Sequence, residues 1–162
     1  MFTEIGMFEY HPAQRARFVD GSLRQKWCQQ YPLLFDKEDQ LIAEHQPRYH
    51  FFEWLAAILL YNCTGYLSLV EQYEFRRHAR KQRILRKLLS SSVLELIYDR
   101  QAYKKTQCPD LLVYAPDMSD WFFCEVKGPQ DRLQSVQKEY FEALAKLSEV
   151  DIRIIRFRKA KA

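Results

Sequence analysis

Two carboxylates and a lysine, Asp110, Glu125 and Lys127, stand in stretches whose patterning predicts strands rather than surface loops. Carboxylate oxygens suit hard ions such as Mg²⁺ and Mn²⁺, which polarise a phosphodiester and lower the pKa of bound water. A lysine beside them can position that water or offset negative charge that builds on a phosphate. These residue types indicate metal-assisted phosphodiester hydrolysis, although spacing alone leaves open a strand-capping Asp and a plain Glu–Lys ion pair.

The elements that must position these residues form a predicted β-hairpin. Apolar residues favour strands over Asp110–Ala115 and Trp121–Lys127, and the polar stretch Pro116–Asp120 favours the turn between them. If the last residue of the first strand pairs with the first residue of the second, Asp110 lies opposite position 126, one residue from Glu125. We therefore expect the two carboxylates and the lysine to converge.

The second strand of this hairpin carries charge on a face that is otherwise apolar, because side chains alternate between the two faces of a strand. In a sheet covered by helices, a carboxylate and an ammonium are costly unless they pair with each other or hold a metal. The expected faces are Trp121, Phe123, Glu125 and Lys127 on one side, and Phe122, Cys124 and Val126 on the other.

The rest of the chain predicts helices on both sides of the hairpin, together with further strands. Pro47 separates two helices, Gly65 ends the second, and Asp131 with Gln134 resembles a capping box for a later helix. A strand–helix–strand passage at the end favours an α/β fold with a mixed sheet. The expected helices are 36–45, 49–62, 76–89, 92–99 and one that carries residues 133–147, and the other strands are 66–73 and 151–157.

Several runs of residues, taken in order, resemble the virus-type replication-repair nuclease domain (VRR-NUC) of the PD-(D/E)XK superfamily. They are Cys-Pro-Asp110-Leu-Leu-Val, then Phe-Cys-Glu125-Val-Lys127-Gly-Pro-Gln-Asp-Arg-Leu, and then Gln137. Upstream, Phe-Phe-Glu53-Trp-Leu-Ala-Ala extends the likeness to the nuclease module of Fanconi-associated nucleases. The resemblance implies a restriction-endonuclease-like mixed sheet flanked by helices, with a helical insertion before the catalytic hairpin.

The resemblance also implies roles that spacing does not single out. It makes Glu53 a metal ligand beside Asp110 and Glu125, adds the backbone carbonyl of Val126 as a ligand, and puts Gln137 near the scissile phosphate. Without it, Glu53 is a first-turn glutamate favoured by the helix dipole, and Gln137 is a surface or capping residue. We expect Mg²⁺ or Mn²⁺ as cofactor and no nucleotide cofactor, because the chain has no glycine-rich phosphate loop.

Basic residues are unevenly distributed, although the net charge of +4 is modest. Residues 74–105 contain ten Lys and Arg against three acids, and the segment from Asp151 adds five basic residues against one acid. Each phosphate contact releases counterions, so these tracts favour a polyanionic partner, although such runs also occur on ordinary solvated surfaces. The expected DNA-binding residues are Arg76, Arg80, Arg83, Lys87, Lys104, Lys105 and Arg132.

Length, cysteines and hydropathy restrict the class of protein. With 162 residues we expect one domain, with a VRR-NUC-type unit over 34–162 and a segment of undetermined role, packed on it, over 1–33. The cysteines lack metal-ligand spacing and are expected to be buried, reduced thiols. No apolar stretch is long enough to cross a bilayer, so we expect a soluble intracellular protein of the cytoplasm, nucleoid or nucleus. Surface or satisfied core positions are expected for His11, His45, His50 and His78, which show no metal-ligand pairing.

The expected function is a metal-dependent endo- or exonuclease acting on branched DNA, either a flap or a four-way junction, in repair or recombination. A monomer suits a flap and a homodimer suits a symmetric junction, and the sequence does not choose between them. The alternative from another class is a non-catalytic DNA-binding module that keeps the nuclease fold. A sequence-specific restriction enzyme is a third possibility, disfavoured because no added recognition domain is visible.

Overall fold

A five-stranded mixed sheet organises the protein in the computed structural model, which describes residues 2–71, 73, 78–98, 108–147 and 150–161. The strand order is β1-β5-β4-β3-β2. The β5 strand runs parallel to both β1 and β4, whereas β3 is antiparallel to β4 and β2. This arrangement confirms the expected α/β class. The strands are β1 (Phe2–Tyr10), β2 (Leu67–Leu69), β3 (Leu111–Tyr114), β4 (Trp121–Lys127) and β5 (Ile152–Lys159).

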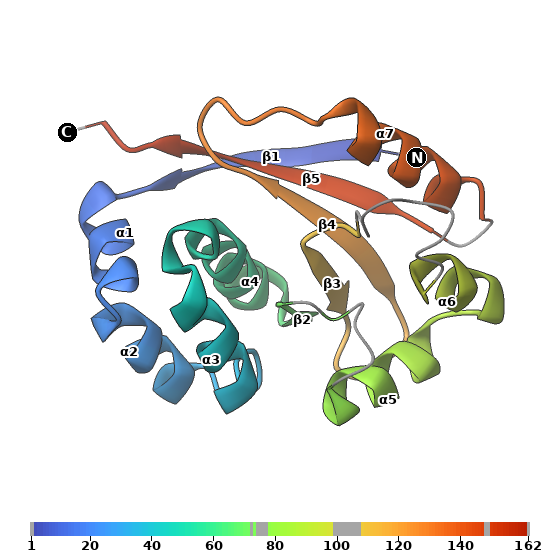
Figure 1. Cartoon of the computed structure of the whole chain (residues 1–162), viewed down its shortest axis with the longest axis horizontal. Helices are drawn as coiled ribbons and strands as arrows, with labels where there is room; N and C mark the ends of the chain where they lie inside the picture. Colours follow the sequence, from blue (N-terminus) through green and yellow to red (C-terminus); the bar gives the residue numbers. More distant parts are fainter. Residues whose placement is uncertain (1, 72, 74–77, 99–107, 148–149, 162) are drawn as a thin grey trace.

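Helices cover both faces of the sheet (Figure 1). Alternate residues of β4 belong to two separate cores: Phe122 packs in the core that contains Trp54, and Phe123 packs in the core that contains Phe141. The two predicted faces of this strand are therefore confirmed. No helix within the described ranges is long and apolar enough to cross a membrane. The helices are α1 (Pro12–Val19), α2 (Ser22–Gln30), α3 (Lys37–His45), α4 (Phe51–Thr64), α5 (Ala79–Leu88), α6 (Ser91–Tyr98) and α7 (Ser135–Ala145), with a 3₁₀ turn at Pro47–Tyr49.

Local sequence explains where two of these helices begin and end. Asp36 caps α3: its carboxylate accepts the backbone N–H of Asp39 at 2.9 Å, and the Asp39 carboxylate accepts that of Asp36 at 3.1 Å. Gly65 ends α4 with a left-handed φ of 76°, which costs glycine no Cβ clash. Both ends lie within two residues of the predicted ones.

The first thirty residues form an integral edge of the sheet. The β1 strand pairs with β5 from Phe2–Ile152 to Tyr10–Lys159. Phe18 and Trp27 of the two following helices pack on Phe51 of α4. All four cysteines are free thiols, but the expectation that they are buried holds only for Cys124, since Cys63 is exposed and the other two are half-buried.

The register of the β3–β4 hairpin differs by one residue from the predicted one. Tyr114, rather than Ala115, pairs with Trp121. The reason lies in the turn, where the backbone N–H of Ala115 donates to the Asp120 carbonyl at 2.9 Å, while the Ala115 carbonyl accepts the N–H of Met118. This shift places Asp110 opposite Glu125 and so brings the two carboxylates closer than expected.

The β2 strand ends earlier than the predicted strand over 66–73, and a buried cation is the reason. The ammonium of Lys81 donates to the carbonyls of Val70 and Glu71, at 2.6 Å each, so these carbonyls are hydrogen-bonded outside the strand ladder. Glu71 has a φ of 49°, a left-handed conformation that is strained for a residue with a side chain. The predicted helix 76–89 is described only from Ala79 onward.

The cap of α7 also differs from the prediction. Gln134, not Asp131, is the N-cap residue. The Asp131 carboxylate instead accepts the backbone N–H of Gly128 at 3.2 Å and closes the turn that leaves β4. The predicted capping box is thus displaced by one turn of chain.

Candidate active site

Asp110 and Glu125 lie next to each other where β3 begins. The backbone N–H of Val126 donates to Asp110 Oδ2 at 2.8 Å, and the backbone N–H of Asp110 donates to Glu125 Oε2 at 3.3 Å. Each carboxylate is thus fixed by the main chain of the other strand. The hairpin itself positions the pair.

Both carboxyls have raised pKa values. Burial is the main cause for Asp110, and the negative charges of Glu125 and Glu53 raise its pKa further, against the opposing effects of the Val126 N–H and Lys127. Burial also raises the pKa of Glu125, although Lys127 acts in the opposite direction. The carboxyls of Asp110, Glu125 and Glu53 therefore outnumber the one neighbouring ammonium, that of Lys127. An excess of carboxyls over positive charge is typical of a site that binds a cation.

Lys127 and Gln137 complete a triangle with Glu125. The Lys127 ammonium lies 2.8 Å from Glu125 Oε1 and donates to Gln137 Oε1 at 3.2 Å. The Gln137 amide nitrogen donates to Glu125 Oε1 at 2.9 Å, and its oxygen also accepts the backbone N–H of Gln134 at 3.1 Å. Gln137 thus belongs both to the start of α7 and to the site.

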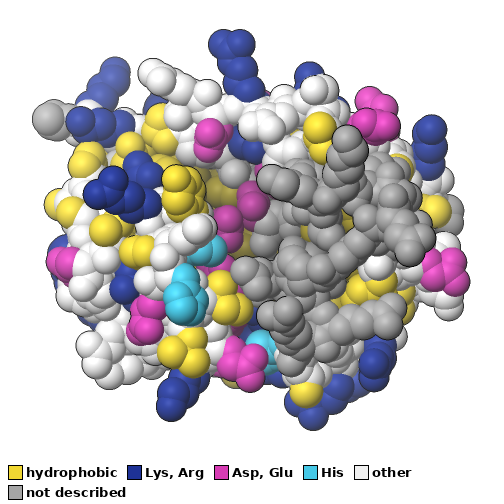
Figure 2. Space-filling model, viewed as in Figure 1, with side chains coloured by type: hydrophobic (Ala, Val, Ile, Leu, Met, Phe, Trp, Pro, Cys, Tyr) yellow, Lys and Arg dark blue, Asp and Glu magenta, His cyan; other side chains and the backbone are white. Residues whose placement is uncertain are grey.

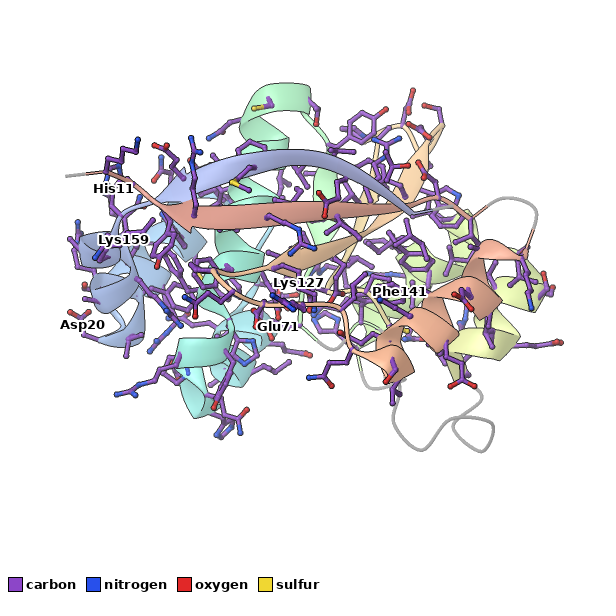
Figure 3. The ribbon with its side chains drawn as sticks, turned by 90° about the horizontal axis from the view of Figure 1, so that it is seen from above. His11, Asp20, Glu71, Lys127, Phe141 and Lys159 are labelled. Carbon is purple, nitrogen blue, oxygen red and sulfur yellow. The ribbon has the colours of Figure 1, made fainter. Side chains whose placement is uncertain are left out.

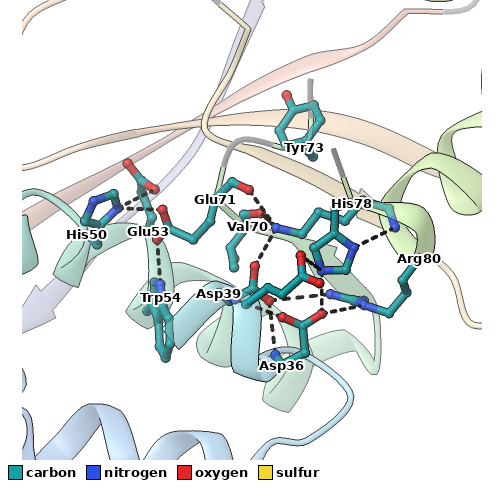
Figure 4. Close-up of polar contacts among 12 residues, drawn as sticks. Asp36, Asp39, His50, Glu53, Trp54, Val70, Glu71, Tyr73, His78 and Arg80 are labelled. Atoms are coloured by element: carbon teal, nitrogen blue, oxygen red, sulfur yellow. Dashed lines mark hydrogen bonds and ion pairs between the residues drawn. The ribbon is translucent and has the colours of Figure 1, made fainter. Parts of the chain in front are cut away.

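Glu53 reaches the same region from the first turn of α4. Beside it lies a group that the sequence does not reveal: His50 Nδ1 is 3.9 Å from Glu53 Oε2 and 2.7 Å from Glu71 Oε2 (Figure 4). The other oxygen of Glu71 accepts the indole N–H of Trp54 at 2.7 Å. Ligand atoms of His50, Glu53 and Glu71 all lie within 4.8 Å of one another, close enough to hold an ion.

A buried ion pair holds the backbone at Glu71. Lys81 and Asp39 are in contact, with side chains that are 1% and 0% exposed, and the same ammonium holds the carbonyl of Glu71 (Figure 4). Nearer the surface, Asp36 accepts from Arg80 at 2.9 Å and lies 2.8 Å from His78 Nε2. The backbone that presents Glu71 is thus attached to both α3 and α5.

The structure brings the predicted residues together. Glu125 contacts Asp110, Lys127 and Gln137, and Glu53 lies near enough to raise the pKa of Asp110. In Figure 3 Lys127 projects toward the part of the fold that carries Glu71. In Figure 2 acidic and histidine side chains lie near the middle of the face, and most Lys and Arg side chains lie further out.

His50, which shows no metal-ligand spacing in the sequence, lies with Glu53 and Glu71 in a group that could hold an ion. Its neighbour Glu71 comes from a turn 21 positions away in the sequence, at the end of β2. No ligand spacing connects the two residues, and Glu71 falls inside the predicted strand. The one available signal is a charged residue next to the apolar pair Leu69 and Val70.

The predicted DNA-binding residues fall into three groups. Arg83, Lys87 and Arg132 are exposed and face solvent. Arg80 is held instead by Asp36 and Asp39, at 2.9 and 3.4 Å. The remaining predicted residues, Arg76, Lys104 and Lys105, lie outside the described residues.

Comparison with known proteins gives the family. The VRR-NUC domain matches residues 36–157. Two crystal structures of paFAN1, bound to 5′ flap DNA of 2 and of 1 nucleotide with a gap, are each 17% identical in sequence with a TM-score of 0.45. Each alignment covers 91% of this chain and 26% of paFAN1, so the chain spans about a quarter of that protein. A search among curated proteins found no match. Since the match to the domain covers about three quarters of the sequence, the chain belongs to the VRR-NUC family of nuclease domains.

Proposed function

We propose that this nuclease domain hydrolyses phosphodiester bonds of branched DNA with the help of Mg²⁺ or Mn²⁺. One observation carries the proposal: the buried carboxyl of Glu125 and the half-buried carboxyl of Asp110 lie side by side, and the ammonium of Lys127 contacts Glu125. Structural ion pairs balance their charges, whereas this group has more carboxylates than cations. An oxygen-binding divalent ion supplies the missing positive charge.

The donor set fits such an ion. Asp110, Glu125 and Glu53 offer carboxylate oxygens, and the carbonyl of Val126 is the fourth donor that the family resemblance implies. When bound, the ion polarises the phosphate and activates water. His50 lies 3.9 Å from the Glu53 carboxylate and is itself in contact with Glu71.

The residues of the chain itself have separate roles in this proposal. Glu125 and Gln137 hold the Lys127 ammonium, so that it can hydrogen-bond the attacking water or offset charge on the phosphate. Gln137 is the positioning residue, because its amide contacts both Glu125 and Lys127. The exposed residues Arg83 and Arg132 are proposed to contact phosphates away from the scissile bond.

The test is cleavage of labelled flap, four-way junction and linear duplex DNA in Mn²⁺ and in EDTA. Asp110→Ala and Lys127→Ala are each expected to slow cleavage by about a hundredfold or more. Asp117→Ala is a matched control, because Asp117 is an exposed aspartate in the turn of the same hairpin. Preference for a flap indicates one active site at a time, and paired cuts in a junction indicate a dimer.

The same experiment separates the proposal from its alternative. If wild-type protein binds all three DNAs but leaves them intact with Mg²⁺ and with Mn²⁺, the chain is a DNA-binding module that keeps the nuclease fold. If cleavage persists in EDTA, the assignment of a metal to Asp110 and Glu125 is wrong.

A further inference from the structure

A pocket of about 590 Å³ lies between α1, the residue Arg48 and the end of β5. Three basic side chains line it, Arg15, Arg48 and Lys159, together with one acid, Asp20. Figure 3 shows Lys159 and Asp20 at the end of the molecule that α1 occupies. We call the pocket that these three basic residues line the cationic pocket.

The charge of the cationic pocket is not neutralised within the described part of the chain. Among the described residues, no carboxylate forms an ion pair with Arg15, Arg48 or Lys159. Asp20, whose carboxylate accepts the backbone N–H of Ser22 at 2.8 Å, carries one negative charge against the three positive charges of the pocket. The pocket therefore presents positive charge to solvent.

Neighbouring arginines of β5 make a useful contrast. Arg156 lies 2.6 Å from the carboxylate of Glu4, and Arg158 lies 3.0 Å from that of Glu9, both across the β1–β5 pair. These two arginines therefore form ion pairs that join β5 to the edge strand β1. Lys159, one residue further on, has no such partner among the described residues and turns to the pocket.

One of the three cations is held in place. The Arg15 guanidinium lies 4.9 Å from the centroid of the Phe52 ring and donates to the carbonyl of Arg48 at 3.3 Å. A guanidinium fixed on an aromatic ring loses little further freedom when it binds an anion, and its remaining N–H groups match a phosphate.

The same aromatic ring connects the pocket to the active site. Phe52 precedes Glu53 in α4, and a Cβ atom added to Gly128 would lie 2.9 Å from the Phe52 ring. Gly128 directly follows Lys127. A second pocket of about 690 Å³ begins at Gly128 and shares Lys159 with the first. A surface with exposed cations therefore continues from the end of β4 to α1.

We propose that Arg15, Arg48 and Lys159 bind backbone phosphates of the DNA strand that flanks the scissile bond. The inference rests on the proposed nuclease function and adds a binding site to it. Arg15 and Lys159 both lie outside residues 36–157, the range that matches the VRR-NUC domain. In this proposal the pocket contacts DNA phosphates and not the edges of bases. It therefore contributes affinity for DNA without a preference for base sequence. This gives the N-terminal segment a role in holding substrate.

The experiment is equilibrium binding of a fluorescent branched DNA, measured by anisotropy in EDTA at several salt concentrations. The variant Arg15→Ala/Arg48→Ala/Lys159→Ala is compared with wild type and with Lys26→Ala/Lys37→Ala/Lys146→Ala. The control removes the same charge from exposed lysines of α2, α3 and the end of α7. Single variants at Arg48 and Lys159, which are exposed, show whether any loss arises from misfolding.

The triple variant is expected to bind at least about tenfold more weakly at 0.1 M salt, with the slope of log K against log salt reduced by about two to three. The control variant should keep the wild-type slope. If both triple variants change affinity equally, the cationic pocket is not a phosphate site, whereas the nuclease proposal stands. If wild-type protein fails to bind DNA, both proposals fall.

Discussion

Replacing Asp110 by asparagine is expected to stabilise the metal-free protein and to remove the stabilisation that Mn²⁺ gives to wild type. Burial raises the pKa of Asp110, and Glu125 and Glu53 raise it further. Since this pKa in the folded state lies above the ordinary value of 3.8, the carboxyl costs stability as the pH rises above about 4. Asparagine has nearly the same shape, and its oxygen can still accept the Val126 N–H, which donates at 2.8 Å.

The size of the effect follows from what the substitution removes. Relief of buried like charge at a functional site is worth about 0.5–2 kcal/mol. For a domain of this length, each 1 kcal/mol raises the Tm by about 2–4 °C. An ion present at a hundredfold excess over its Kd stabilises the wild type by about 2.7 kcal/mol. The variant should therefore melt above the wild type in EDTA and below it in Mn²⁺.

The assay is thermal unfolding at pH 5 and pH 8, in EDTA and in Mn²⁺, with Asp117→Asn as the control for loss of an exposed carboxylate. The advantage of Asp110→Asn in EDTA should be larger at pH 8 than at pH 5. The reasoning is refuted if the variant is the less stable protein in EDTA at pH 8, or if Mn²⁺ raises the Tm of wild type and variant equally.

Three further substitutions test the framework around the site. Burial acts to raise the pKa of Asp36, but the Asp39 N–H and the neighbouring arginine and histidine hold it at about 2. Asp36→Ala should therefore lower the free energy of unfolding in urea by about 1 kcal/mol at pH 6. This difference should disappear as the pH falls from about 4 to 2. Lys81→Met leaves the carboxylate of Asp39 buried and should cost about 3–5 kcal/mol, and a loss below 1 kcal/mol would show that the pair is not structural. Gly128→Ala puts a Cβ 2.9 Å from the Phe52 ring and should cost about 1–3 kcal/mol by calorimetry, with recovery in the Phe52→Leu background.

The parts of the fold that sequence predicts well are those that short-range patterns determine. The strand Trp121–Lys127 was located to the residue, because aromatic and β-branched residues alternate between its faces. The convergence of Asp110 with Glu125 also followed from local arithmetic, since a hairpin joins residues that are close in sequence. The one-residue error came from the turn, where the main-chain hydrogen bonds of Ala115 shorten the ladder.

Residues held by distant parts of the chain could not be predicted. Lys81 belongs to a helix rich in basic residues and resembles its solvated neighbours, yet it is buried against Asp39, 42 positions away. Glu71 takes a left-handed conformation that no glycine or asparagine signals. The β1 strand was missed because its apolar residues do not keep to one face: Ile5 and Met7 are 40% and 56% exposed, whereas Phe8 and Tyr10 pack in the core.

The position of β5 has a consequence for how the molecule comes into existence during synthesis. β5 lies between β4 and β1 in the sheet, although it is the last strand of the sheet to be made. Until β5 leaves the ribosome, β1 and β4 each have an unpaired edge. The first residue pair of β1 with β5 joins Phe2 to Ile152, about 150 residues apart in the sequence. Such pairing makes folding slow, because loop closure precedes any gain from contact. A nascent chain halted before Ile152 should thus depend on chaperones, whereas release of β5 should let the sheet close in one cooperative step.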